Sequence, residues 1–336
     1  MLTKKVGKQT LQFPNTPVVK SWASAVGPKE GEGPLGQYFD LILDNNLDKG
    51  DKSWEATEQK LMQHSLEIAL EKVKLQPQDV DYFFAGDLLN QIITANFTAR
   101  FFGIPFFGLY GACSTLSEGM VLASILLDGG YAQRVGVSAS SHHDTAERQL
   151  RFPTEMGTQR PMTGQWTVTG GGSYILENQG QGIVITGATV GKIVDKGSSN
   201  NNDMGTAMAP AAFDTLKTHL EDLGKQITDY DLIITGDLGS LGLNVLKELL
   251  ARDGYPTDNV SDCGVLIYSP EQDTHCGGSG CGCSAVVMNY ILQGMLEKKY
   301  RKIFFIGTGA LLSPTSNFQG ETIPCIGHGV ALEYNG

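Results

Sequence analysis

Residues 111–119 read Gly-Ala-Cys-Ser-Thr-Leu-Ser-Glu-Gly, and this stretch decides the fold. The apolar run 106–110 precedes it, and apolar residues recur after it at 116, 120, 123 and 127, which is the spacing of a helix. The sequence therefore predicts that a strand ends and a helix begins close to Cys113. A thiol in the first turn of a helix lies near unpaired backbone N–H groups and the positive end of the helix dipole, where anions are favoured.

The same pattern occurs a second time in the chain. Matched segments follow in the same order: 81–88 with 231–238, Cys113 with Cys281, 134–137 with 302–305, and 172–177 with 329–333. Chance similarity between any two strand–helix units is the alternative explanation. The shared order favours a duplicated unit, and it predicts two related halves of parallel strands with crossover helices.

Composition and charge narrow the classes of function. The net charge of −11 argues against nucleic acid or anionic lipid as a direct partner. No apolar run approaches the roughly 18 residues needed to span a bilayer, and the first residues lack the apolar core of a signal peptide. We therefore expect synthesis in the cytoplasm, with any membrane association made through protein partners.

The chain has 6 cysteines, which should be free thiols in a reducing compartment. Cys276, Cys281 and Cys283 cluster near His275, but their spacing is wrong for common zinc sites. We predict no metal site there, and a glycine-rich turn that packs against a helix instead.

The predicted fold class is α/β, with an N-terminal half at 1–178 and a C-terminal half at 179–336. Two insertions are expected in the first half, at 27–53 and 138–169, and the second reads as a long polar loop, which is usually functional or interfacial. Among other elements, the sequence predicts helices from Ser53 to about Lys74 and within 203–224, and a strand at 264–269.

A duplicated α/β chain with a helix-capping Ala-Cys-Ser motif resembles the thiolase superfamily, which includes ketoacyl synthase III. The resemblance covers most of the chain, and it implies an α-β-α-β-α arrangement of five layers and a homodimer. Within this superfamily, several motifs resemble the stage V sporulation protein AD family more closely: residues 86–91, 110–115, 140–143 and 275–282.

That closer resemblance implies binding of dipicolinic acid, either free or as its calcium chelate. It also implies uptake of this compound into the developing spore, together with other stage V sporulation A membrane proteins. The protein would then lie peripherally at the spore inner membrane, held by those partners and without direct lipid binding. No cofactor is expected apart from the ligand and its calcium.

The condensing enzymes of this superfamily use a cysteine and two further groups that hold the thioester oxygen. Where the resemblance places the first histidine, this chain has Gly236-Asp237, and His275 lies a few residues before the position of the second group. Since losing one oxyanion donor can cost roughly 10²–10³ in rate, we expect no catalytic residues and a scaffold converted to ligand binding. Two alternatives remain: an acyltransferase that uses Cys113 with His275, and a scaffold for a membrane channel complex.

The predicted ligand-binding residues share short polar side chains or imidazoles near predicted strand ends and helix starts: Asp87, Asn90, Cys113, Ser114, His142 and His275. The helix start at Cys113 and Ser114 could receive one carboxylate. The imidazoles could donate to the other, and Asp87 could orient the ligand or hold calcium. Weaker candidates are other residues of the polar stretch and one near the end of the chain: His143, Arg148, Arg151, Arg160 and His328.

Overall fold

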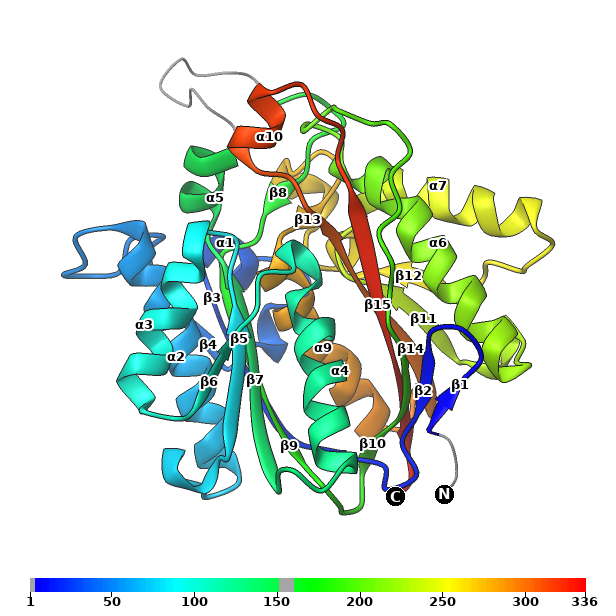
Figure 1. Cartoon of the computed structure of the whole chain (residues 1–336). Helices are drawn as coiled ribbons and strands as arrows, with labels where there is room; N and C mark the ends of the chain where they lie inside the picture. Colours follow the sequence, from blue (N-terminus) through cyan, green and yellow to red (C-terminus); the bar gives the residue numbers. More distant parts are fainter. Residues whose placement is uncertain (1–3, 151–159) are drawn as a thin grey trace.

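Helices and sheets alternate in layers across the computed structural model, which describes residues 4–150 and 160–336 (Figure 1). In the first half the strands follow the spatial order β6 (Phe106–Gly108), β5 (Tyr82–Gly86), β7 (Arg134–Ser141), β9 (Gly170–Glu177) and β3 (Val18–Val26). In the second half they follow the order β12 (Val260–Asp262), β11 (Leu232–Thr235), β14 (Lys302–Ala310), β15 (Cys325–Tyr334) and β10 (Ile183–Thr189).

The two strand sets have the same directions as well as the same order. β5 is parallel to β6 and β7, while β9 is antiparallel to β7 and β3. In the second half β11 is likewise parallel to β12 and β14, and β15 is antiparallel to β14 and β10. The structure thus confirms two internally repeated halves, joined by a short antiparallel contact of β3 with β10. The boundary between 178 and 179 stays a prediction.

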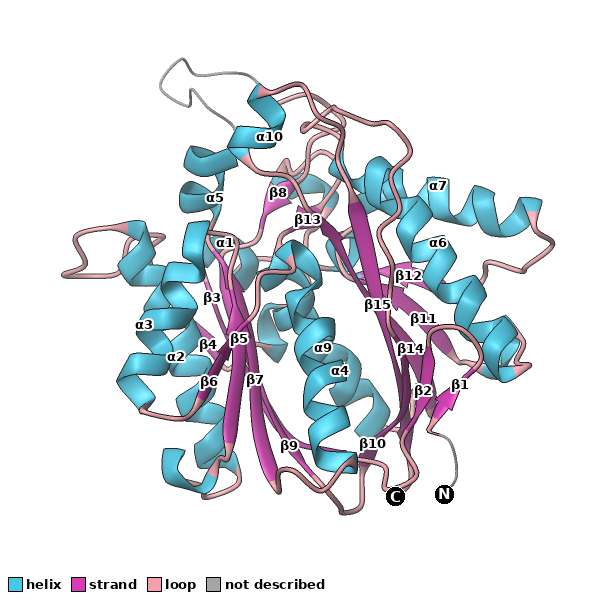
Figure 2. Ribbon diagram, in the orientation of Figure 1, coloured by secondary structure: helices cyan, strands magenta, loops and turns pink. Residues whose placement is uncertain are grey.

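Two helices lie between the two sets of strands, α4 (Thr115–Asp128) and α9 (Cys281–Leu296) (Figure 2). Most of α9 is buried, as its run of apolar and small side chains predicts for a central helix. Outer helices cover the other faces: α2 (Trp54–Lys72) and α3 (Ile93–Phe102) on the first half, α6 (Met204–Leu223) and α7 (Gly239–Arg252) on the second.

Glycines allow the central helices to approach the sheets closely. A Cβ on Gly172 of β9 would lie 2.1 Å from the backbone oxygen of Ala285 in α9. A Cβ on Gly307 of β14 would lie 2.2 Å from the Ser117 hydroxyl of α4. The layers can therefore lie this close only because residues 172 and 307 are glycines, which have no side chain.

Capping residues set the helix ends that the sequence predicts. The Ser53 hydroxyl accepts a hydrogen bond from the Ala56 N–H, and the Asp203 carboxylate accepts one from the Thr206 N–H. Gly224 ends α6 in the left-handed conformation, which a glycine adopts without steric cost.

The remaining elements are short, apart from α5: β1 (Lys5–Val6), β2 (Thr10–Gln12), β4 (Leu41–Ile42), β8 (Trp166–Thr167), β13 (Gly278–Ser279), α1 (Pro28–Gly31), α5 (His143–Leu150), α8 (Cys263–Leu266) and α10 (Pro314–Phe318). None of the helices in the described ranges is long and apolar enough to cross a membrane.

Two sequence predictions of local structure were wrong. The stretch 138–169 is not one long loop, because β7 continues to Ser141 and α5 follows at once. The stretch 264–269 is not a strand, because β12 ends at Asp262 and α8 begins at Cys263. A short apolar run does not separate strand from helix by its period alone.

Candidate functional site

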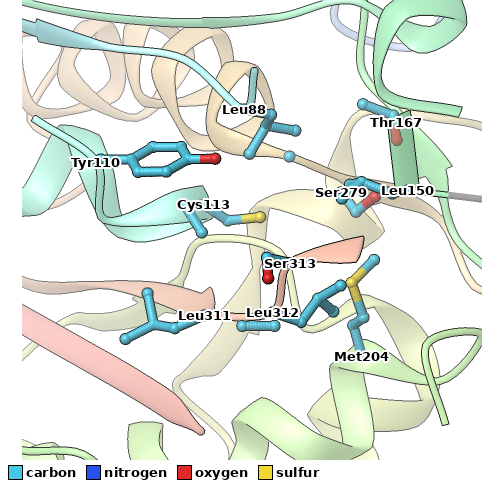
Figure 3. A pocket seen from close by; sticks show the side chains of 13 residues that line it. Leu88, Tyr110, Cys113, Leu150, Thr167, Met204, Ser279, Leu311, Leu312 and Ser313 are labelled. Atoms are coloured by element: carbon cyan, nitrogen blue, oxygen red, sulfur yellow. The ribbon is translucent and has the colours of Figure 1, made fainter. Parts of the chain in front are cut away.

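A cavity of about 250 Å³ opens beside the turn that leads into α4, where strand ends from both halves meet (Figure 3). Its lining combines apolar walls with a thiol and hydroxyl groups: Leu88, Tyr110, Ala112, Cys113, Leu150, Thr167, Met204, Ser279, Gly280, Ala310, Leu311, Leu312 and Ser313. Ligand sites of layered α/β proteins commonly lie at such strand ends.

A short 3-10 turn, Ala112–Ser114, places Cys113 at the cavity wall just before α4. Ala112 adopts a positive φ of 50°, and the Ser114 hydroxyl donates to the Gly111 carbonyl at 2.7 Å. The turn packs against β14, where a Cβ on Gly309 would lie 2.5 Å from the Gly111 oxygen. Glycines on β14 therefore make room for the turn that presents Cys113.

Among charged groups, the carboxyl of Asp237, which follows β11 of the other half, has the largest effect on Cys113. Burial raises the pKa of the Cys113 thiol well above its ordinary value, and the charge of Asp237 and a hydrogen bond to it raise the pKa further. A backbone hydrogen bond from Gly280 opposes this shift, but it is the weakest of these influences. Cys113 is therefore a neutral thiol near neutral pH, in contrast to the thiolate that nucleophilic cysteines need.

Asp237 is itself buried and firmly held. Its carboxylate accepts hydrogen bonds from the Gly280 N–H at 3.0 Å and from the Thr308 hydroxyl at 2.9 Å. Burial raises the pKa of Asp237 to about 6, although these hydrogen bonds and one with Cys113 lower it. The carboxyl thus fixes the glycine-rich turn before α9 against the end of β14.

Asp87 lies next to the cavity residue Leu88, but its carboxylate caps the chain after β5. It accepts hydrogen bonds from the N–H groups of Leu89 at 2.8 Å and Ala95 at 2.9 Å, and it is buried. Burial raises the pKa of Asp87, and these hydrogen bonds lower it. Asn90 reaches the rim of the cavity, because its side-chain oxygen accepts a hydrogen bond from the Tyr110 hydroxyl at 3.2 Å.

The other three predicted ligand-binding residues, Ser114, His142 and His275, are not among the residues that line the cavity. Ser114 follows Cys113 directly, but its hydroxyl is engaged by Gly111. The buried His142 ring contacts the Asn46 carbonyl at 2.7 Å and accepts from the Asp144 N–H at 3.2 Å. His275 contacts the Pro161 carbonyl at 2.8 Å, so neither imidazole is among the residues that line the cavity.

None of the weaker candidates that the structure describes is among the residues that line the cavity, although His143 and Arg160 both lie beside Glu147 of α5. Arg148 pairs with Glu55 on α2, and Arg160 pairs with Glu147 on α5. The His328 ring accepts from the Gly191 N–H at 3.2 Å, and burial lowers its pKa to about 4. Arg151 lies outside the described residues.

Sequence reasoning missed most of the polar lining: Tyr110, Thr167, Ser279 and Ser313. Tyr110 precedes Cys113 by three positions, so its place in the motif was a usable signal. Ser279 belongs to the glycine-rich stretch before Cys281, which is the counterpart of the Cys113 turn. Thr167 and Ser313 carry no local signal, and only the fold brings them to the cavity.

Solved structures with this fold define the class of protein. A single-residue variant of Xanthomonas campestris OleA matches with a TM-score of 0.67 and 11% identity, covering 96% of this chain and 98% of that chain. The 3-oxoacyl-[acyl-carrier-protein] synthase III of Aquifex aeolicus VF5 matches with a TM-score of 0.61 and 13% identity, covering 95% and 100%. The chain has a thiolase-like fold of the ketoacyl synthase III type, as the sequence predicts.

Sequence relatives define the family more narrowly. The family model for stage V sporulation protein AD (SpoVAD) matches residues 7–333. A Bacillus subtilis (strain 168) protein of that name is 49% identical over 335 residues, which are 99% of each chain. The chain belongs to the stage V sporulation protein AD family, and a role in sporulation follows from that membership.

Proposed function

We propose that this protein binds dipicolinic acid in the cavity beside Cys113 and catalyses no reaction on it. The observation that carries the proposal is a small cavity with apolar walls, several hydroxyl groups and a neutral thiol at a helix start. A planar ring fits between apolar walls, and hydroxyl groups can donate to carboxylate oxygens. The membership in a sporulation family supports this choice of ligand, whose uptake into the spore the resemblance implies.

The size of the cavity favours a single small ring. Pockets for drug-sized ligands measure about 300–1,000 Å³, whereas this cavity measures about 250 Å³. Leu88 and Leu311 supply apolar surface, while Tyr110 and Ser313 supply hydroxyl groups (Figure 3). A ring with two carboxylates uses both kinds of contact.

The environment of Cys113 argues against acyl transfer. A nucleophilic cysteine is usually activated by a neighbouring base or a lowered pKa, but Asp237 acts in the opposite direction. Within the described part of the chain, the cavity lining includes no histidine that could assist a thioester. We therefore propose binding without turnover.

In the proposed role, the protein delivers dipicolinic acid for uptake into the developing spore. It would act with other stage V sporulation A membrane proteins and lie peripherally at the inner membrane through them. Calcium would arrive as part of the ligand's chelate, because the Asp87 carboxylate is already engaged by two backbone N–H groups.

The edge of the first sheet supports a homodimer as part of this proposal. Among the described strands β6 is the last on its side. Phe107 within β6 is 49% exposed, and Phe101 at the end of the neighbouring α3 is 61% exposed. An unpaired edge with exposed apolar groups fits pairing with a second copy. Tyr110, which is 54% exposed and lines the cavity, lies close to this edge in the sequence.

A thermal-shift comparison tests the proposed ligand. Dipicolinate should raise the melting temperature, and isomers with the carboxylates at other ring positions should raise it less, because binding to the folded state alone stabilises it. Incubation with acetyl-CoA and longer acyl-CoAs, followed by mass spectrometry, tests the absence of catalysis. Acylation of Cys113 with transfer to an acceptor would replace the proposal with an acyltransferase.

A further inference from the structure

Dipicolinate that binds without calcium brings two negative charges into the main cavity, and the hydroxyl groups there do not neutralise them. Within the described residues, the lining of this cavity contains no lysine, arginine or histidine. Burying a carboxylate without a charged or hydrogen-bonding partner is costly. A compensating cation should therefore come from a neighbouring part of the site.

A small recess of about 10 Å³ adjoins the cavity and leads toward α5. It shares Leu150, Thr167, Met204 and Leu312 with the main cavity, and it is also lined by Glu147. This volume is close to the roughly 10–15 Å³ that one water needs. The recess thus has room for one small polar group, such as a carboxylate oxygen.

Glu147, which lines the recess, pairs with an arginine. An Nη of Arg160 lies 3.1 Å from a carboxylate oxygen of Glu147, and both side chains are largely buried, with exposed fractions of 16% and 17%. The guanidinium carbon of Arg160 lies 4.4 Å from the centre of the Trp166 ring. The ring of Trp166, which precedes the cavity residue Thr167 in β8, thus stacks on the guanidinium and fixes its position beside Glu147.

The Glu147 carboxylate has a second cationic neighbour. The Nδ1 of His143, one turn earlier on α5, lies 3.9 Å from the same oxygen of Glu147. His143 therefore offers the Glu147 carboxylate a second partner on the same helix. A guanidinium is suited to exchange one carboxylate for another, because its planar fork matches the carboxylate oxygens.

We propose that Arg160 binds one carboxylate of the ligand, and that Glu147 occupies this position on Arg160 until the ligand displaces it. This proposal rests on the proposed function of the main cavity. Binding of a second carboxylate by Arg160 would make the site specific for dicarboxylates. Glu147 acts against binding in two ways, because it holds the guanidinium and repels an incoming anion. The two residues should thus affect affinity in opposite directions.

Calorimetry with dipicolinate tests the proposal on the full chain. Arg160→Gln should weaken binding about tenfold or more, as expected for the loss of a hydrogen bond between charged groups. The affinity of Arg160→Lys should lie between those of wild type and Arg160→Gln, because lysine keeps the positive charge but lacks the planar guanidinium. Glu147→Gln should strengthen binding, since the amide keeps the shape and removes the negative charge.

A charge-specific probe separates this role from a structural one. The probe is the uncharged diamide of the same ring. Compared with wild type, Arg160→Gln should show a smaller ratio of dipicolinate affinity to diamide affinity, and Glu147→Gln should show a larger one. Arg148→Gln is the matched control, because Arg148 lies on the same helix as Glu147 and pairs with Glu55 on α2. It should leave both affinities unchanged.

The outcomes distinguish the two proposals. Suppose that wild type binds dipicolinate and Cys113→Phe does not, while Arg160→Gln keeps wild-type affinity and discrimination. The proposed function would then stand and the role of Arg160 would be wrong. Weaker binding by Glu147→Gln would also overturn the exchange, even if Arg160→Gln failed to fold. Absence of dipicolinate binding by wild type would remove both proposals.

Discussion

The Asp237 carboxyl raises the pKa of the Cys113 thiol, although the two residues come from different halves of the chain. Cys113 precedes α4 of the first half, and Asp237 follows β11 of the second. The repeat creates this arrangement, because it places the helix start of one half at the strand end of the other. Burial, reinforced by the charge of Asp237, keeps the cysteine neutral at the wall of the cavity.

Removing the charge of Asp237 should make Cys113 more reactive. Because the Asp237 charge raises the pKa of the Cys113 thiol, Asp237→Asn should lower that pKa and increase the thiolate fraction at pH 8. Alkylation by iodoacetamide, followed at Cys113 by peptide mass spectrometry, should be several-fold faster than in wild type. Asp87→Asn is the control, since Asp87 acts on the Cys281 thiol instead. Equal rates in wild type and Asp237→Asn would contradict this account of the thiol.

A methyl group on Gly172 should destabilise the protein. Its Cβ would lie 2.1 Å from the backbone oxygen of Ala285, so β9 and α9 would have to separate. We expect Gly172→Ala to lose about 1–3 kcal/mol or more in the free energy of unfolding. Gly236→Ala should lose less, because the nearest atoms lie 3.4 Å from its Cβ position. Urea denaturation measures both variants, and equal losses would argue against the close layer contact at Gly172.

The buried carboxyl of Glu30 should make stability depend on pH. Burial raises the pKa of Glu30 from 4.5 to about 7 in the folded protein, despite hydrogen bonds from Tyr268 and the Thr169 N–H. The folded state therefore holds the proton more tightly than the unfolded state, and its contribution to stability is lost as the pH rises from about 4.5 to 7.

Glu30→Gln, which stays neutral at every pH, isolates this contribution. The melting temperature of wild type relative to Glu30→Gln should be highest near pH 5 and should fall toward pH 8. A difference that stays constant over this range would mean that Glu30 keeps an ordinary pKa.

The homodimer proposal predicts a monomer when the β6 edge is charged. Phe107→Glu places a carboxylate on the exposed edge strand, where it should oppose pairing with a second copy. Sedimentation equilibrium should report a dimer for wild type and a monomer for the variant. Tyr131→Glu changes a side chain that is 73% exposed in the turn after α4 and should leave the dimer intact. A wild-type monomer at micromolar concentration would refute this part of the proposal.

Much of the fold could be predicted from local sequence. The apolar run 232–234 lies within the observed β11, and Asp203 and Gly224 mark the two ends of α6. The helix α5 was missed, because its sequence His-Asp-Thr-Ala-Glu-Arg-Gln-Leu offers few apolar residues to show a helical period. β12 was missed because three residues give too short a pattern.

The site was less predictable than the fold. The motif at Cys113 identified one wall of the cavity, since a helix start is visible in the sequence. Thr167, Met204 and Ser313 come from separate segments, and only tertiary packing brings them together. The sequence predicted that the imidazoles of His142 and His275 would contact the ligand. In the fold they contact the backbone carbonyls of Asn46 and Pro161 instead.

Calorimetric titration of dipicolinate into wild type and Cys113→Phe tests the central claim most directly. Wild type should bind, with and without calcium, and the folded Cys113→Phe variant should not, because the larger ring fills the cavity. Cys113→Ala should bind nearly as well as wild type, since a neutral thiol contributes shape and not reactivity. Circular dichroism confirms the fold of each variant. If a folded Cys113→Phe variant bound dipicolinate like wild type, the ligand site would lie elsewhere and the account would be contradicted.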